Sequence, residues 1–225
     1  MSVIARDKNC AQVAAACDTA RAGGAYRVAK RTFDIVFSLI VIVVLIIPAL
    51  VLCIIVAIDT KGTPLYLQKR IGRGGKPFTL LKYRTMTRTA DAVEQHLSDE
   101  QLRQWHNERK VDDDPRVTRL GRALRNTSLD ELPQFLNVLV GQMSVVGPRP
   151  VTEHELHWFG DDLDEYLSVP MGITGLWQVT SRNDAHFEDG KRQQIELDYV
   201  RRRSIRLDAQ IMRRTLGTML EKRNG

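Results

Sequence analysis

The stretch Ile35–Ile58, which reads IVFSLIVIVVLIIPALVLCIIVAI, decides the fold of this chain. It contains no charged residue, and Ser38 is its only clearly polar side chain. As an α-helix it extends for about 36 Å at roughly 1.5 Å per residue, which is enough to cross a bilayer. Uncharged apolar runs of about 18 residues or more indicate a membrane segment rather than a buried core helix. The sequence therefore predicts a membrane-inserted hydrophobic helix over residues 30–60.

The two ends of this run and its central proline favour a re-entrant helix. Within about 20 residues of the run, lysine and arginine occur on both sides, so the bias that orients a spanning helix is missing. These basic residues are Arg21, Arg27, Lys30 and Arg31 before the run, and Lys61, Lys69, Arg70, Arg73 and Lys76 after it. Pro48 lies near the middle, where proline kinks a helix. We predict a kinked segment that enters and leaves by one leaflet, with a simple single span as the alternative.

The length of 225 residues suits one sizeable domain or two small ones. Residues 1–29 hold no apolar core, so we expect a poorly ordered tail there and no cleavable signal peptide. Residues 61–225 are the part expected to form a domain at the cytoplasmic face. The three cysteines, Cys10, Cys17 and Cys53, show no disulfide or metal spacing, which is typical of a reducing compartment.

The net charge of +6 points to an anionic partner, either nucleic acid or a membrane surface. The last segment, Lys191–Arg223, is strongly basic and has apolar residues between its arginines. This pattern predicts an amphipathic helix at a membrane interface. Because the segment has no run of stacking aromatic residues, we expect membrane lipids and no nucleic acid as its partner.

The pattern of the remaining chain predicts few strands. Leu65–Gln68 and Phe78–Tyr83, separated by a glycine-rich loop, predict a small β-hairpin. Asp91–Lys110 has a thin apolar stripe and predicts an exposed amphipathic helix. Pro170–Asn183 is interpreted as a loop-rich stretch.

The segment Ser128–Gln134, which reads SLDELPQ, is the strongest chemical signal. A helix accepts Pro133 only in its opening turn, so Asp130 and Glu131 are expected at a helix mouth. Backbone N–H groups and the macrodipole favour negative charge there, and such a mouth can receive a phosphate or a metal–phosphate complex. The alternative is a capping box, with Ser128 as N-cap and Glu131 three residues later.

Several arginines near this segment are candidates for binding phosphate. Arg119, Arg122 and Arg125 precede it closely in sequence. Arg149 stands between Pro148 and Pro150, and a stiff backbone there could aim its guanidinium at phosphate oxygens in bidentate fashion.

The run Asp112-Asp113-Asp114-Pro115 leaves two interpretations open. Its carboxylates could bind Mg²⁺, in a way that resembles the Asp-x-Asp site of nucleotide-sugar transferases. The other interpretation is a solvated acidic turn before a proline.

Several segments, in order along the chain, match those of one family. They are Lys30-Arg31-x-Phe33-Asp34, Gln68-Lys69-Arg70-Ile71-Gly72, Lys82-Tyr83-Arg84-Thr85-Met86, Asp114-Pro115-Arg116-Val117-Thr118, Leu124-Arg125 with Ser128–Gln134, Gly141 with Met143–Pro150, and Gly172–Gln178 with Arg182-Asn183. Over about residues 30–216 the chain resembles the bacterial sugar transferases, which are small monotopic phosphoglycosyl transferases. It looks most similar to those that prime exopolysaccharide synthesis.

The resemblance implies a fold that is mainly α with a small β-hairpin, in which the kinked N-terminal helix and amphipathic interfacial helices hold a catalytic domain at the cytoplasmic face of the bacterial inner membrane. It implies transfer of a hexose-1-phosphate, galactose or glucose, from a UDP-hexose to undecaprenyl phosphate with release of UMP. Asp130 would be the nucleophile and form a covalent phosphosugar, while Glu131 and Asp130 would hold Mg²⁺.

The remaining site residues are also carried over from the resemblance, as groups that hold the substrate. They are Lys82, Arg84, Arg125, Arg149, Arg182 and Asn183. Two alternatives stay open: a metal-dependent glycosyltransferase that uses Asp112 and Asp114 to transfer the bare sugar, and a non-catalytic membrane scaffold. A homodimer is compatible with the phosphoglycosyl transferase and with both alternatives.

Overall fold

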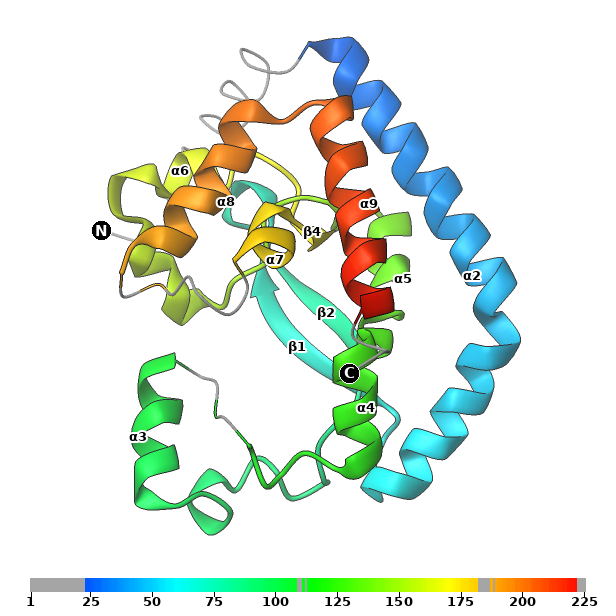
Figure 1. Ribbon diagram of the computed structural model, residues 1–225, viewed down its shortest axis with the longest axis vertical. Helices are drawn as coiled ribbons and strands as arrows, with labels where there is room; N and C mark the ends of the chain where they lie inside the picture. Colours follow the sequence, from blue (N-terminus) through cyan, green and yellow to red (C-terminus); the bar gives the residue numbers. More distant parts are fainter. Residues whose placement is uncertain (1–22, 109–110, 112, 182–186, 188, 222–225) are drawn as a thin grey trace. The chain divides into compact units, whose positions relative to one another are not determined.

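The computed structural model describes residues 23–108, 111, 113–181, 187 and 189–221, and these are mostly helical (Figure 1). Its elements in chain order are α2 (Gly24–Thr60), β1 (Leu65–Ile71), the 3₁₀ turn η1 (Arg73–Gly75), β2 (Pro77–Tyr83), η2 (Val93–Gln95), α3 (Asp99–Glu108), α4 (Arg119–Thr127), η3 (Leu129–Glu131), α5 (Gln134–Leu139), β3 (Ser144–Val146), η4 (Glu153–Asp162), α6 (Leu163–Tyr166), β4 (Gly172–Thr174), α7 (Leu176–Thr180), α8 (Lys191–Arg202) and α9 (Ile205–Glu221).

The chain divides into two compact units. Unit 1 comprises Met1–Val44, Leu67–Leu81 and Gln134–Gly225, and unit 2 comprises Leu45–Tyr66 and Lys82–Pro133. Each unit includes part of α2 and part of the β1–β2 hairpin, which the sequence-based division at residue 60 did not anticipate.

The predicted apolar helix is confirmed as α2, which continues through Pro48 (blue to cyan in Figure 1). It begins at Gly24, so residues 24–29 belong to this helix and not to the predicted tail, of which residues 1–22 lie outside the described residues. The helix is long and apolar enough to cross a membrane, and only 6% of its most apolar window is buried. A core helix of a soluble protein would be mostly buried, so α2 presents an apolar surface outward.

The first turns of α2 are joined to unit 1 by polar side chains. Arg31 donates to the carbonyl oxygens of Val138 (2.7 Å) and Leu139 (2.9 Å) at the end of α5. These are carbonyls that the end of a helix leaves without intrahelical partners. The buried carboxylate of Asp34 accepts from Ser144 Oγ (3.0 Å) and the Val145 N–H (2.9 Å) at the start of β3.

A second connection joins α2 to the C-terminal helices of unit 1 through Asp208 on α9. Its carboxylate accepts from Lys30 Nζ (2.8 Å), Tyr26 Oη (3.0 Å) and Tyr199 Oη (2.8 Å). Little of the Lys30 or Asp208 side chains is exposed, so three donors satisfy a carboxylate that burial alone would destabilise. The N-terminal half of α2 is therefore part of the unit 1 fold.

Two short parallel strands form the centre of unit 1. Strand β3 pairs with β4, with Ser144 opposite Gly172 and Val146 opposite Thr174. A Cβ atom on Gly172 would lie 2.1 Å from the nitrogen of Gly147, so no side chain fits at this crossing. Pro170–Asn183 is therefore not simply a loop, because it contains β4 and helix α7; a three-residue strand is too short to show an alternating pattern.

The apolar core of unit 1 surrounds these strands. Its buried residues include Val138, Met143, Val146, Tyr199 and Ile211, and side chains from α2, α5 and α9 pack on them. The predicted C-terminal amphipathic helix is in fact two helices, α8 and α9 (orange to red in Figure 1).

The basic character of these C-terminal helices is partly neutralised within unit 1. Arg201 pairs with Glu165 (2.7 Å) and Asp162 (3.1 Å), and Arg202 pairs with Asp198 (2.9 Å). These two arginines therefore have acidic partners in the protein as well as any membrane charge.

Unit 2 packs the second half of α2 against the hairpin and α4. Val56, Tyr83 and Leu124 form its main buried cluster, and the Tyr83 hydroxyl donates to the carbonyl oxygen of Ala49 (3.0 Å). The β1–β2 hairpin confirms the prediction and extends it by a few residues. The predicted Asp91–Lys110 helix is shorter than expected, because a 3₁₀ turn precedes α3.

Candidate functional site

Asp130 lies in a tight turn of unit 2 that directly follows helix α4. Helix α4 ends at Thr127, and Ser128 adopts a left-handed conformation with φ of 58°. This conformation reverses the chain directly into η3, where Asp130 is only 7% exposed. Left-handed backbone costs a non-glycine residue roughly 1–2 kcal/mol, and such strain occurs often at functional sites.

The alternative capping box is wrong. Ser128 is the residue that ends α4, and its side chain makes no capping hydrogen bond to η3. The prediction of a helix mouth needs a related revision, because α5 starts at Gln134 and has only six residues. Pro133 does stand just before that helix, as expected. A helix this short has a weak macrodipole, so neighbouring arginines are the more important source of positive charge.

Helix α4 is fixed to the segment after β2 at close range. Thr118 caps α4 by accepting from the Gly121 N–H at 2.8 Å, and its own N–H donates to the Thr85 carbonyl oxygen at 3.1 Å. A Cβ atom on Gly121 would lie 2.0 Å from that same carbonyl oxygen. Glycine at this position therefore lets α4 approach Thr85 closely enough to use its side chain.

That side chain holds Arg125, which is five residues before Asp130. The Nε–H of Arg125 donates to Thr85 Oγ1 at 2.9 Å, and this bond fixes the plane of the guanidinium. Arg125 as a whole is exposed, yet the protein packed around its guanidinium lowers its pKa, while the carboxylates of Asp130 and Asp114 oppose this shift. Asp130, Arg125 and Thr85, with Glu131, are called the Asp130 site below.

The carboxylates of the Asp130 site suit Mg²⁺ only in combination with a substrate. The described residues contain no group of three or more acidic, histidine or cysteine side chains arranged to hold a metal ion. Mg²⁺ is commonly bound by one or two carboxylates, water and substrate phosphates. Asp130 and Glu131 are adjacent in η3 and match that donor set.

Asp114 has a structural role. Its two oxygens accept from Arg116 Nε (2.8 Å) and Nη2 (2.6 Å), and Arg116 also donates to the carbonyl oxygen of Ala90. These hydrogen bonds lower the pKa of Asp114 against the opposing effect of its burial, which is the largest single influence. A carboxylate engaged in this way is poorly available to a metal, which disfavours the Asp112–Asp114 interpretation; Asp112 lies outside the described residues.

The other predicted substrate residues of unit 2 lie in β2 and directly after it. Arg84 donates to the Thr63 carbonyl and hydroxyl oxygens, at 2.9 and 3.0 Å, and lies over the Tyr66 ring. Lys82 is half-buried in β2. All three arginines before Asp130 are exposed, and Arg125 is the one whose guanidinium is bonded to Thr85. The predicted Arg182 and Asn183 lie outside the described residues.

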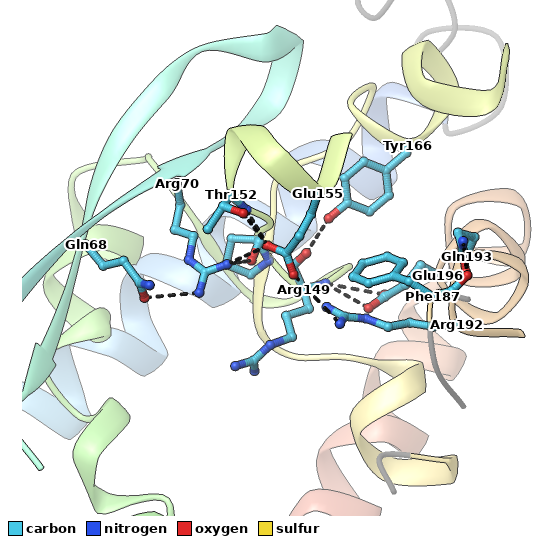
Figure 2. A network of polar contacts seen from close by, with 11 residues as sticks. Gln68, Arg70, Arg149, Thr152, Glu155, Tyr166, Phe187, Arg192, Gln193 and Glu196 are labelled. Atoms are coloured by element: carbon cyan, nitrogen blue, oxygen red, sulfur yellow. Dashed lines mark hydrogen bonds and ion pairs between the residues drawn. The ribbon is translucent and has the colours of Figure 1, made fainter. Parts of the chain in front are cut away.

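Arg149 belongs to a separate group in unit 1, shown in Figure 2. Its backbone N–H donates to both carboxylate oxygens of Glu196, each at 3.3 Å, and its carbonyl oxygen accepts a short hydrogen bond from Tyr166 Oη. Its guanidinium lies 6.0 Å from the centroid of the Trp177 ring, a distance at which cation–π attraction operates. The Arg149 cluster is defined here as Arg70, Arg149, Glu155, Tyr166, Arg192 and Glu196.

The Arg149 cluster contains arginines paired with glutamates. Arg70 pairs with Glu155 at 3.1 Å, and Arg192 lies 4.0 Å from the same carboxylate. Burial lowers the pKa of Arg70 to about 10, whereas burial raises the pKa of Glu196 to about 7 against the attraction of Arg192 and Arg149. The cluster is a paired network with one more arginine than glutamate.

Sequence reasoning proposed Arg149 as a site residue but did not identify the residues that hold its backbone. Glu196, Tyr166 and Arg192 occur in helices where acidic, aromatic and basic residues are common, so no local pattern distinguishes them. One signal was present: Glu196 and Arg192 are four residues apart, so they lie on one face of a helix.

With this geometry described, comparison with known proteins identifies the class. A sequence model of the family described as bacterial sugar transferase matches residues 25–222. The chain therefore belongs to the bacterial sugar transferase family, as the resemblance implied.

Named relatives include a UDP-galactose-lipid carrier transferase of Erwinia amylovora, which is 43% identical over 202 residues. The exopolysaccharide production protein ExoY of Sinorhizobium fredii is 38% identical over 192 residues, and an undecaprenyl-phosphate galactose phosphotransferase of Salmonella typhimurium is 40% identical over 200 residues. These matches cover 88%, 84% and 87% of this chain. The chain spans 42% and 41% of the Erwinia and Salmonella proteins but 84% of ExoY.

Proposed function

We propose that this chain transfers a hexose-1-phosphate from a UDP-hexose to undecaprenyl phosphate, releasing UMP, as a priming step of exopolysaccharide synthesis. The family supports this, since two of the relatives are named for lipid-carrier or undecaprenyl-phosphate sugar transfer and a third for exopolysaccharide production. The observation that carries the proposal is the buried carboxylate of Asp130, which acts electrostatically on the guanidinium of Arg125.

In the first step an oxygen of the Asp130 carboxylate attacks the sugar-bearing phosphorus of the UDP-hexose. The bond between that phosphorus and the bridging oxygen breaks, and UMP leaves with the electron pair. In the second step a phosphate oxygen of undecaprenyl phosphate attacks the same phosphorus and restores the carboxylate. Splitting the transfer in two in this way is nucleophilic catalysis, which needs an ionised and well-positioned carboxylate.

Phosphoryl transfer depends mainly on positioning and on positive charge around the phosphate oxygens. Arg125, with its guanidinium plane fixed by Thr85, is placed to provide that charge close to Asp130. Arg149 is the corresponding candidate in unit 1. Asp130 and Glu131 would hold Mg²⁺, which when bound would offset the charge of the diphosphate.

We further propose that α2 is re-entrant and places the enzyme at the cytoplasmic face of the inner membrane. Asp34 is bonded to β3, and Ala49 accepts from Tyr83, so both positions contact folded protein. The helix between them is only about 22 Å long at roughly 1.5 Å per residue, shorter than the hydrocarbon core of about 30 Å. Labelling of introduced cysteines from each side of the membrane tests this, and opposite accessibility of the two ends would contradict it.

The two other functions have less support. A glycosyltransferase that transfers the bare sugar through an Asp112–Asp114 metal site would need Asp114 to leave Arg116. A non-catalytic scaffold has less support, because relatives in this family are named as transferases.

The decisive experiment uses purified full-length protein in nanodiscs with UDP-galactose or UDP-glucose, each labelled in the sugar. Without undecaprenyl phosphate, we expect a labelled adduct that mass spectrometry locates on Asp130, with one UMP released per adduct. Adding undecaprenyl phosphate should discharge the adduct into lipid. Asp130→Asn should lower turnover by about 10³-fold or more, equal to about 4 kcal/mol.

Asp113→Asn is the matched control, because Asp113 is an exposed carboxylate of the same unit that pairs with Arg122 at 3.2 Å. It should keep nearly full activity. Release of UDP instead of UMP, or product formation by folded Asp130→Asn, would refute the proposal. The pair of sugars also decides which hexose is preferred.

A further inference from the structure

The backbone of Arg149 is held on both sides by buried side chains. Proline has no N–H, so Arg149 supplies the single backbone N–H within Pro148–Pro150. Both oxygens of Glu196 on α8 accept that N–H, and Tyr166 of α6 donates to the carbonyl oxygen of the same residue (Figure 2). Two elements that are distant in sequence therefore fix one residue of a short loop.

Both holding residues are almost inaccessible to water. Glu196 is 2% exposed and Tyr166 is 0% exposed. A buried carboxylate is costly unless charges and hydrogen bonds compensate it, and a neutral side chain could have packed there at lower cost. Arg192, one turn earlier on α8, provides the largest compensating electrostatic effect. The hydrogen bond from the Arg149 N–H explains why a glutamate, and not an apolar residue, occupies this buried position.

Around Glu196 the charged and titratable groups come from four elements and one loop. They are Arg192 on α8, Arg149 in the loop, Tyr166 on α6, Glu155 on η4 and Arg70 on β1, the last two acting through Arg192 and Tyr166. Arg192 is also placed against two aromatic rings, 4.2 Å from the centroid of Trp177 and 3.9 Å from that of Phe187. The arginine that compensates the Glu196 carboxylate is thus itself fixed by packing against Trp177 and Phe187.

We propose that Glu196 and Tyr166 are positioning residues that clamp the Arg149 backbone, so that its guanidinium is directed at the phosphate oxygens of the nucleotide-sugar donor. This rests on the proposed function for the identity of the ligand. Ordering a group before binding removes an entropic cost that would otherwise reduce affinity. The clamp should therefore act on donor binding more than on the chemical step.

The first test is amide hydrogen exchange of full-length protein in nanodiscs, followed by mass spectrometry of peptides that cover Pro148–Pro150. Because Arg149 is the single exchangeable amide of that tripeptide, its rate can be resolved. Glu196→Ala should speed exchange by about tenfold or more, as expected for loss of a hydrogen bond to a charged group. Glu196→Gln, which keeps an acceptor oxygen, should give a smaller change.

The second test is steady-state UMP release against donor concentration for the same variants. Glu196→Ala and Tyr166→Phe should raise KM for the UDP-hexose by about tenfold and leave kcat within about twofold, since the lost hydrogen bond serves binding. Glu196→Gln should partly restore KM. Asp198→Asn is the control, because Asp198 is a more exposed carboxylate of the same helix, paired with Arg202 at 2.9 Å.

The outcomes separate the clamp from the reaction. Unchanged Arg149 exchange in folded Glu196→Ala and Tyr166→Phe would overturn the clamp. Faster exchange with unchanged KM in an active enzyme would overturn its role in donor binding. A wild-type protein that releases no UMP would refute the proposed function, while the exchange rates would still decide whether Glu196 holds Arg149.

Discussion

Asp130 and Arg149 are held in different ways. Asp130 is placed by its own neighbours: a left-handed residue two positions earlier, a single turn of 3₁₀-helix and Arg125 five positions earlier. Arg149 is placed by side chains that come 17 and 47 residues later in the chain. The backbone around Asp130 is local, with one long-range side-chain contact between Arg125 and Thr85, whereas the Arg149 cluster is built from several long-range side-chain contacts.

This difference fits the two kinds of chemistry. A nucleophilic carboxylate must be ionised and presented at one point, and a tight turn with one adjacent positive charge achieves that. An arginine that recognises phosphate has a long side chain with many rotamers, so its direction must be imposed from several sides. We therefore expect single substitutions to have large effects at the Asp130 site and graded effects in the Arg149 cluster.

The largest effect after loss of Asp130 itself is expected at Arg125. Arg125→Ala removes a positive charge that acts on Asp130, the proposed nucleophile, and should lower single-turnover UMP release by about 10²- to 10³-fold, equal to about 3–4 kcal/mol. Arg125→Lys should fall between, because it keeps the charge without the planar fork. Arg122→Ala, an exposed arginine on the same helix, is the control. If folded Arg125→Ala retains a rate within about threefold of the wild type, the Asp130 site does not depend on one local charge and the comparison fails.

A second effect concerns pH and the stability of unit 1. Burial raises the pKa of Glu196 from 4.5 to about 7, so the folded protein binds this proton more tightly than the unfolded chain does. Stability should therefore fall as pH rises from about 4.5 to about 7 and should level off above that, by at most about 3 kcal/mol from this residue. Glu196→Gln stays neutral and lacks this loss.

Denaturant unfolding of wild type and Glu196→Gln in the same detergent, at pH 5, 6, 7 and 8, measures the difference. The variant should gain stability relative to the wild type as pH rises. If the difference in unfolding free energy between the two proteins does not depend on pH, Glu196 has the same pKa in the folded and unfolded states. The contrast between the Arg149 cluster and the Asp130 site would then be weaker.

The smallest effect is expected at Thr85, which follows strand β2 and accepts the Arg125 Nε–H. Thr85→Val keeps the shape but removes the acceptor of the Arg125 Nε–H, and it should reduce kcat/KM by about five- to tenfold, equal to about 1 kcal/mol. Thr85→Ser keeps the hydroxyl and should stay close to wild type. Equal losses in both variants would show that packing at Thr85 matters, and not its hydrogen bond.

The sequence predicted features that depend on residues close together in the chain. The apolar α2 helix, the hairpin and the start of a helix after Pro133 follow from composition, glycine loops and the geometry of proline. The sequence predicted that an exposed helix begins at Asp91, whereas α3 begins at Asp99. It also predicted one long C-terminal helix, whereas the structure has α8 and α9.

Features that depend on tertiary contacts were missed for a physical reason. The parallel β3–β4 pair joins segments that are far apart, and each strand has only three residues. Ser128 does precede a short 3₁₀-helix, but the end of α4 at Thr127 and the left-handed backbone that keeps the Ser128 side chain from capping η3 were not foreseen. Glu196 could not be selected from many surface-like glutamates, since only packing reveals that it is buried.

The first turns of α2 carry a practical lesson for making this protein. Arg31 and Asp34 complete the hydrogen bonding of α5 and β3, and Phe37 packs against the core of unit 1. A shortened protein that lacks the apolar run is attractive for crystallisation or inhibitor screening. Such a truncation would remove the hydrogen-bond partners of α5 and β3 and expose the core of unit 1. The apolar helix α2 is therefore also part of the folded core of unit 1, and the protein has to be purified with this helix intact.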